Sequence, residues 1–106
     1  MNEGSHRSHK EEVVASLRDK QAIQQFLDAQ ALLKHHLVHT RQILNGKDFL
    51  FLGPGTELHD ALRLMVKVEH EYSRFIHIDF VRVDEYFLLR VVGSEEDQQV
   101  VSGYFE

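Results

Sequence analysis

The sequence lacks cysteine and has no long hydrophobic run. Without cysteine there is no disulfide framework, no cysteine-ligated zinc site and no cysteine nucleophile. Without a run of about 18 apolar residues there is no candidate transmembrane helix. The polar residues 1–10 also lack the apolar segment of a secretory signal. We therefore expect a cytoplasmic protein without a membrane partner.

An excess of positive charge is also missing. Twelve Lys and Arg residues stand against 17 Asp and Glu residues, so the net charge is −5. Nucleic acid is therefore an unfavourable partner. The chain is histidine-rich, and protonation of all eight histidines would change the net charge from −5 to +3. We interpret these histidines as scattered surface residues rather than as a switch.

The composition is that of an ordinary folded chain. Of the 106 residues, 42% are hydrophobic and 27% are charged. We expect residues 1–9 to form a flexible N-terminus and residues 10–106 to form a single α+β domain.

Residues 11–45 have the apolar spacing of helices, and no proline interrupts them. One unbroken helix over this stretch would be about 52 Å long at 1.5 Å per residue. A domain of this size has a radius of gyration of only about 13 Å. The sequence at 16–19 (SLRD) is typical of a break, after which Asp19 can cap the next helix. We predict a short helix near 10–17 and a long one near 20–44. The alternative is a single projecting helix that pairs with a second chain.

Asn45-Gly46 is ambiguous, because this pair is both a good helix end and a strong hairpin turn. Residues 37–44 do not alternate cleanly between apolar and polar, so we favour a helix that ends here over a hairpin. Beyond it, Phe49–Leu52 is a short apolar run typical of a buried strand. The Gly-Pro-Gly at 53–55 ends that strand.

Residues 56–70 carry two competing patterns. One has helical spacing after a cap at Thr56, and its apolar members are Leu58, Ala61, Leu62, Met65 and Val68. The other alternates as a strand does, through Leu62, Leu64, Val66 and Val68. We favour a helical turn or loop at 56–60 followed by a strand at 61–70, and keep the helix as the alternative.

Two later segments, Phe75–Val83 and Tyr86–Val92, are rich in β-branched and aromatic residues. A two-residue turn at 84–85 would pair them in one register. That register collects aliphatic residues on one face and places Asp79 directly opposite Arg90 on the other face.

Gln98–Phe105 is predicted as the last strand. The expected fold is therefore α+β, with N-terminal helices packed on a mostly antiparallel meander of about five strands. The second face of the sheet is itself rich in apolar residues, which are Val81, Val83, Tyr86, Leu88 and Val92. One helix cannot cover both faces, so a second chain would bury the uncovered face, or that face would line a pocket.

His77, Asp79 and Arg90 form the best candidate ligand-binding site. His77 and Asp79 are two apart on a strand and share a face. A histidine beside a carboxylate can act as a general acid or base, and a curled sheet could place the trio in a pocket. The alternative is an ion pair on a partly wet face, which is the more common arrangement. We assign no catalytic residue.

Two further motifs are weaker. His35 and His39 are four apart, a spacing that places two metal ligands on one helix face, but two ligands do not make a site. We favour a solvated helix face and assign no metal. The glycines at 53–55 could cradle a phosphate at a helix start. The third glycine of a dinucleotide motif would fall at Leu58, so we favour a simple turn.

No catalytic set is complete, since the sequence has no nucleophile-elbow, serine–lysine or EF-hand motif. We therefore expect a non-enzymatic interaction or regulatory domain without a cofactor, acting as a homodimer through its sheet or long helix. The alternative is a small-molecule pocket protein or enzyme that uses the site at His77, Asp79 and Arg90. In architecture alone, helices before a curved sheet, the chain resembles the nuclear transport factor 2-like group of pocket folds.

Overall fold

Three helices and one four-stranded sheet form the described part of this protein, which comprises residues 9–72, 76–95, 100–101 and 104–105 of a computed structural model. In chain order the elements are α1 (His9–Ser16), α2 (Lys20–His36), β1 (Leu37–Ile43), β2 (Gly46–Leu52), α3 (Gly55–Tyr72), β3 (Ile76–Val83) and β4 (Tyr86–Gly93). The α+β class is confirmed, with four strands instead of about five. Most of the expected flexible N-terminus, residues 1–8, lies outside the described residues.

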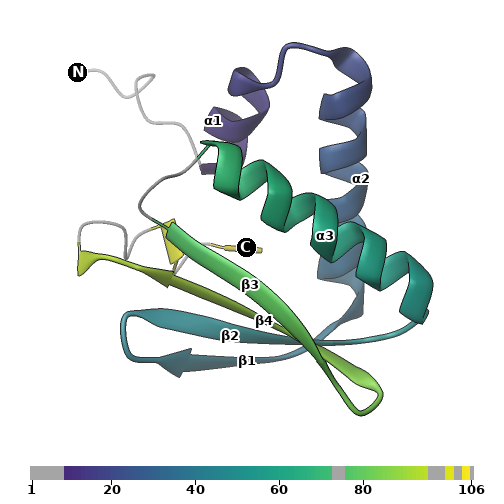
Figure 1. Ribbon diagram of the computed structural model, residues 1–106, viewed down its shortest axis with the longest axis vertical. Coiled ribbons are helices and arrows are strands. Elements are labelled where there is room, and N and C mark those ends of the chain that lie inside the picture. Colours follow the sequence, from purple (N-terminus) through teal and green to yellow (C-terminus); the bar gives the residue numbers. More distant parts are fainter. Residues whose placement is uncertain (1–8, 73–75, 96–99, 102–103, 106) are drawn as a thin grey trace.

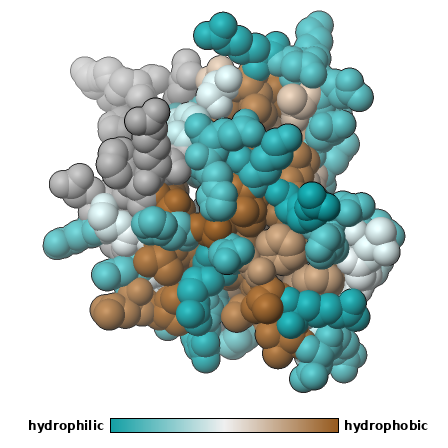
Figure 2. Space-filling view, viewed as in Figure 1, coloured by the Kyte–Doolittle hydropathy of each residue, from teal (hydrophilic) through white to brown (hydrophobic). Residues whose placement is uncertain are grey.

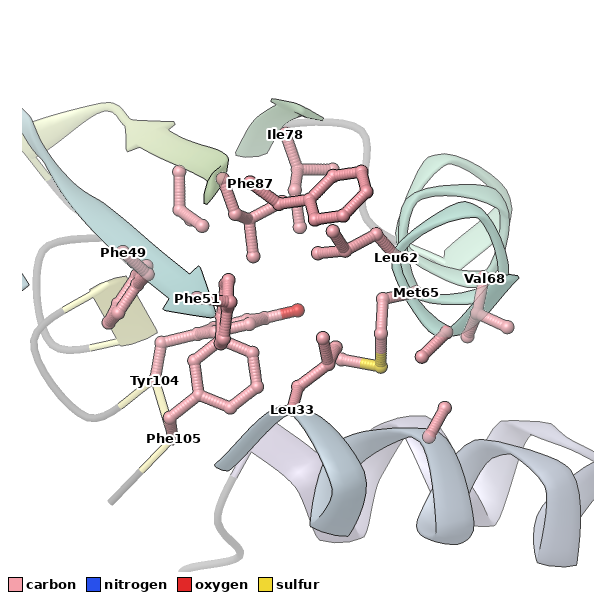
Figure 3. Packing of buried hydrophobic residues seen from close by; sticks show 14 of the residues in the cluster. Leu33, Phe49, Phe51, Leu62, Met65, Val68, Ile78, Phe87, Tyr104 and Phe105 are labelled. Atoms are coloured by element: carbon pink, nitrogen blue, oxygen red, sulfur yellow. The ribbon is translucent and has the colours of Figure 1, made fainter. Parts of the chain in front are cut away.

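The sheet has the strand order β1-β2-β4-β3, and each neighbouring pair is antiparallel. All three helices lie on one side of it (Figure 1). The core fills the space between the two layers: Leu33 of α2 and Leu62 and Met65 of α3 point toward Phe51 and Phe87 of the sheet (Figure 3). None of the helices in the described ranges is long and apolar enough to cross a membrane.

The predicted break between the first two helices is confirmed, and Asp19 is the cap. Its Oδ1 accepts a hydrogen bond from the backbone N–H of Gln21 at 3.3 Å. This bond satisfies one of the four N–H groups that a helix start leaves without a partner. The helix that follows ends at His36, well before the expected end near residue 44. The projecting single helix is therefore excluded.

The preference for a helix up to Asn45 was wrong, because β1 and β2 form a hairpin around that residue. Asn45 has φ 61°, a left-handed conformation that asparagine tolerates well. β1 is an edge strand with mostly exposed side chains, and a bulge interrupts its register between Leu37 and His39. An exposed, bulged strand does not need alternating apolar residues, so the pattern that would have revealed it is absent.

The strand expected at 61–70 was also wrong, because that stretch belongs to α3. The helical pattern describes the buried face of α3, which consists of Leu58, Ala61, Leu62, Met65, Val68 and Glu69. The misleading alternation came from Leu64 and Val66, which flank this face and pack half-buried against the core. A helix whose apolar stripe is widened on both flanks imitates the period of a strand.

The predicted register of the last two strands is confirmed: Val83 pairs with Tyr86, and Asp79 lies opposite Arg90. The predicted fifth strand at Gln98–Phe105 was wrong for the described residues. Val100 and Val101 are helical, and Tyr104 and Phe105 form a turn. Their aromatic rings pack on the inner face of the sheet, where the rings of Phe105 and Phe49 lie 5.1 Å apart. Residues 98–99 and 102–103 lie outside the described residues.

Candidate functional site

The face of the sheet turned away from the helices is called the outer face, and no described helix covers it (Figure 1). Successive side chains of a strand point to opposite sides, so alternate residues belong to it. They are His39, Arg41 and Ile43 of β1; Asp48, Leu50 and Leu52 of β2; Tyr86, Leu88, Arg90 and Val92 of β4; and His77, Asp79, Val81 and Val83 of β3.

Apolar side chains occupy much of the outer face. Val81 is 54% exposed, Val83 is 47% exposed and Leu52 is 37% exposed. Leu50 and Leu88 lie opposite each other at the centre and are half-buried. The space-filling view shows hydrophobic residues, interspersed with hydrophilic ones, at the surface in the lower half of the molecule, where the sheet lies (Figure 2). Exposed apolar residues concentrated on one sheet face are typical of an interaction surface.

A row of four charged residues crosses the outer face from edge to edge. Register places Arg41 beside Asp48, Asp48 beside Arg90, and Arg90 beside Asp79. Arg90 donates to Asp48 from two nitrogens, Nε at 2.7 Å from Oδ1 and Nη2 at 2.9 Å from Oδ2. Arg41 Nη2 lies 2.9 Å from the same Oδ2. Asp48 is therefore held by two arginines.

The two arginines also set the ionisation of Asp48. Only 3% of the Asp48 side chain is exposed, whereas 63% of the Arg41 side chain and 51% of the Arg90 side chain are exposed. The hydrogen bonds from Arg90 lower the pKa of Asp48 despite the opposing effect of burial, and Arg41 lowers it further. Asp48 is thus a stable anion under a pair of solvent-facing cations.

The candidate site at His77, Asp79 and Arg90 lies on this outer face, and all three residues are exposed. Arg90 uses its guanidinium on Asp48 instead of Asp79. Asp79 Oδ1 accepts from the backbone N–H of Phe80 at 2.8 Å. The register therefore places the trio together as predicted, but the strongest contact of Arg90 is with a residue that the sequence did not single out.

The fold separates the first of the two weaker motifs, the histidine pair, and keeps the second, the glycines at 53–55, between a strand and a helix. His35 lies in α2 and His39 in β1, so their four-residue spacing no longer places them on one helix face. Within the described residues, no three His, Asp or Glu side chains are grouped as a metal site requires. α3 begins at Gly55. A Cβ at Gly55 would lie 3.9 Å from Nη1 of Arg82, an ordinary contact distance, so the position has room for a side chain.

A second buried carboxylate lies on the helix side. Glu69 of α3 is fully buried, and Tyr104 donates a hydrogen bond from its hydroxyl to Glu69 Oε2 at 2.7 Å. His9 Nε2 lies 2.9 Å from each carboxylate oxygen. Burial, reinforced by the charge of Glu69, raises the pKa of Tyr104 well above its usual value. This cluster ties both ends of the described chain to α3.

Two grooves of the described surface lie beside α3. One of about 690 Å³ follows α3 and the edge at Phe80, and its wall includes Arg63, Leu64 and Lys67. Another of about 630 Å³ lies between the start of α3 and Arg82. Neither of these two is lined by His77, Asp79 or Arg90.

Comparisons of the chain with protein-family models, with curated proteins and with solved structures gave no match. None of these comparisons supports the resemblance to the nuclear transport factor 2-like group that the sequence suggested.

Proposed function

We propose that this protein is a non-enzymatic interaction or regulatory domain of the cytoplasm, acts as a homodimer through its outer face, and takes neither nucleic acid nor a cofactor as partner. The observation that carries the proposal is the uncovered sheet face, with Leu52, Val81 and Val83 exposed on it. Antiparallel sheets normally keep one face polar and wet. A second copy would remove these apolar side chains from water.

The charges on the outer face are compatible with burial. Asp48 is already desolvated and satisfied within one copy, and the arginines above it bind carboxylates in a planar, bidentate geometry. Arginine is also enriched in protein interfaces, where lysine is depleted. The small-molecule alternative has less support, because it requires His77, Asp79 and Arg90 to converge in a concave pocket.

The test is sedimentation equilibrium on the full chain from low to high micromolar concentration. We expect a mass near twice 12.4 kDa at the upper end. The double variant Val81→Lys/Val83→Lys places two charges on the outer face and is expected to be monomeric over the same range. Val81 and Val83 lie on an edge strand and are exposed, so the fold should tolerate lysine at both positions.

The matched control is Gln25→Lys/Ala31→Lys, which adds the same two charges at exposed positions of α2. This variant is expected to dimerise like the unmodified protein. A monomer at every concentration of the unmodified protein would remove the proposal. Equal dimerisation of both double variants would show that the interface is not the outer face.

A further inference from the structure

The charged row on the outer face is antisymmetric. Read from β1 to β3, the charges of Arg41, Asp48, Arg90 and Asp79 are plus, minus, plus and minus. Reversing the row exchanges every plus for a minus. A surface with this property is complementary to a second copy in which the order of the strands is reversed, so that β3 of the copy lies over β1.

We propose that two copies stack outer face on outer face around a two-fold axis that runs parallel to the strands, between β2 and β4. The proposal rests on the homodimer proposed above and specifies its geometry. The axis places Arg41 against the partner's Asp79 and Asp48 against the partner's Arg90. All four residues of the row then face a charge of opposite sign.

The apolar residues of the outer face match under the same rotation. In the neighbouring row, Leu50 lies between His39 and Leu88. The axis places Leu50 against the partner's Leu88, so four leucines meet at the centre of the interface. Gly46, which pairs with Val92 in its own sheet, faces the partner's Val92. A residue without a side chain thus meets a branched one.

Asp79 gives this arrangement its specificity. Within one copy, its described polar contact is the bond from the backbone N–H of Phe80. Arg41 shares Asp48 with Arg90, which already binds that carboxylate with two nitrogens. The stacked pair gives each Asp79 a cation and gives each Arg41 a carboxylate of its own.

Rotation about an axis across the strands gives a worse match. If that axis follows the charged row, Arg41 faces the partner's Arg41 and Asp48 faces the partner's Asp48. If it follows the Leu50–Leu88 row, the charges face Leu52, Tyr86 and Val83 and lose water without gaining a partner. Pairs of stacked sheets keep their strand directions within about 30° of each other, which both axes allow, so the match of charges and leucines decides between them.

The outer face is small for an interface. Four strands at a spacing of about 4.8 Å span about 19 Å, and seven residues at about 3.4 Å span about 24 Å. Two faces of that size bury about 900 Å² together, which is below the range of stable interfaces and in the class of weak, transient association. Exchange of chains between dimers should therefore be rapid, which makes mixing experiments possible.

The first test uses the absence of cysteine, because any introduced thiol is unique. His39→Cys and Val81→Cys leave the charged row intact, and the axis places residue 39 against the partner's residue 81. We expect a short bismaleimide reagent to link chains in a mixture of the two variants and to link neither variant alone. Identical positions in the dimer are separated laterally by three strand spacings, about 14 Å.

The second test concerns charge. Asp79→Lys faces the partner's Arg41 and should weaken dimerisation by about tenfold, as a like-charge contact does. Arg41→Glu faces the partner's Asp79 and should weaken it similarly. Mixing these two variants restores opposite charges at both contacts, so a heterodimer of the original affinity is expected. Glu71→Lys, the same charge change at an exposed position of α3, is the control.

The outcomes separate the two proposals. A chain that is monomeric throughout defeats the proposed function itself. If Val81→Lys/Val83→Lys disrupts the dimer but two chains of His39→Cys are cross-linked to each other, the interface is the outer face and only the proposed axis is wrong. The proposed axis is also wrong if the mixture of His39→Cys and Val81→Cys forms no cross-links. It is equally wrong if mixing Asp79→Lys with Arg41→Glu does not restore the affinity of dimerisation.

Discussion

Two buried carboxylates, Asp48 and Glu69, lie on opposite sides of the sheet and are held in different ways. Glu69 is surrounded by groups that are themselves withdrawn from water, since the His9 side chain is 14% exposed and Tyr104 is 6% exposed. Asp48 is covered by two arginines that remain largely exposed. The helix side therefore contains a closed polar cluster, and the outer face contains an open one.

The exposure of the partners distinguishes a carboxylate that only stabilises the fold from one whose partners also form part of a surface. A closed cluster serves to hold the chain together, because its members are largely withdrawn from water. An open cluster also presents its cations to the surroundings, so the same arginines that satisfy Asp48 can meet another carboxylate. On this comparison Glu69 is important for stability, and Asp48 contributes to both stability and recognition.

The largest effect is expected for Glu69→Ala. Its loss leaves the Tyr104 hydroxyl buried without its acceptor and removes the link between α3 and His9. We expect the free energy of unfolding to fall by about 3 kcal/mol, measured by urea denaturation with far-ultraviolet circular dichroism. Glu71→Ala, two residues along the same helix and exposed, should change it by less than about 0.5 kcal/mol. Equal effects would mean that the closed cluster stabilises nothing.

A smaller effect is expected for Tyr104→Phe, which keeps the ring and removes the hydroxyl. The loss of a hydrogen bond to a carboxylate should cost about 1.5 kcal/mol at neutral pH. The pKa of Tyr104 is raised in the folded protein, so folding favours the neutral phenol. Its contribution is present below pH 10.0, the usual pKa, and is lost as the pH rises above that value.

The alkaline loss of stability should therefore be steeper for the unmodified protein than for Tyr104→Phe. Denaturation at a series of pH values above 9 measures the slopes. Tyr86→Phe, at a half-buried position of the outer face, is the control and should retain the slope of the unmodified protein. Parallel slopes for all three proteins would contradict the cluster at Tyr104.

The smallest effect is expected for Asp48→Asn, at about 1 kcal/mol, because its arginine partners are exposed and screened. The pKa of Asp48 is lowered in the folded protein, so its contribution is complete above the usual value of 3.8 and is lost as the pH falls below it. Denaturation between pH 5 and pH 2 should show a shallower acid loss for Asp48→Asn than for the exposed control Asp60→Asn. The opposite order would show that Asp48 is not held as an anion.

The sequence predicted the parts of this molecule whose determinants are local. The break capped by Asp19 and the hairpin register that places Asp79 opposite Arg90 each depend on residues close together in the chain. The strand β1 was missed because it lies at an edge and is exposed. Its side chains therefore do not need to alternate between apolar and polar. The helix α3 was missed because Leu64 and Val66 added a second period beside its buried stripe.

The site was predicted only in part for a related reason. An inner strand such as β4 has two neighbours, and the sequence reveals the one that is joined to it by a tight turn. The other neighbour of Arg90 is Asp48, 42 residues away along the chain. Asp48 does carry a signal, since it is the acidic residue in an otherwise apolar and basic strand, but its partners follow only from the sheet order.

The most direct test of the account is a filtered nuclear Overhauser experiment on a mixture of isotope-labelled and unlabelled chains at high micromolar concentration. It detects contacts between chains and suppresses those within one chain, including the contact of Leu50 with Leu88 in the same sheet. We predict signals between the methyl groups of Leu50 in one chain and those of Leu88 in the other. Signals between chains that arise only from leucines of the helix side, such as Leu27 or Leu32, would contradict the account.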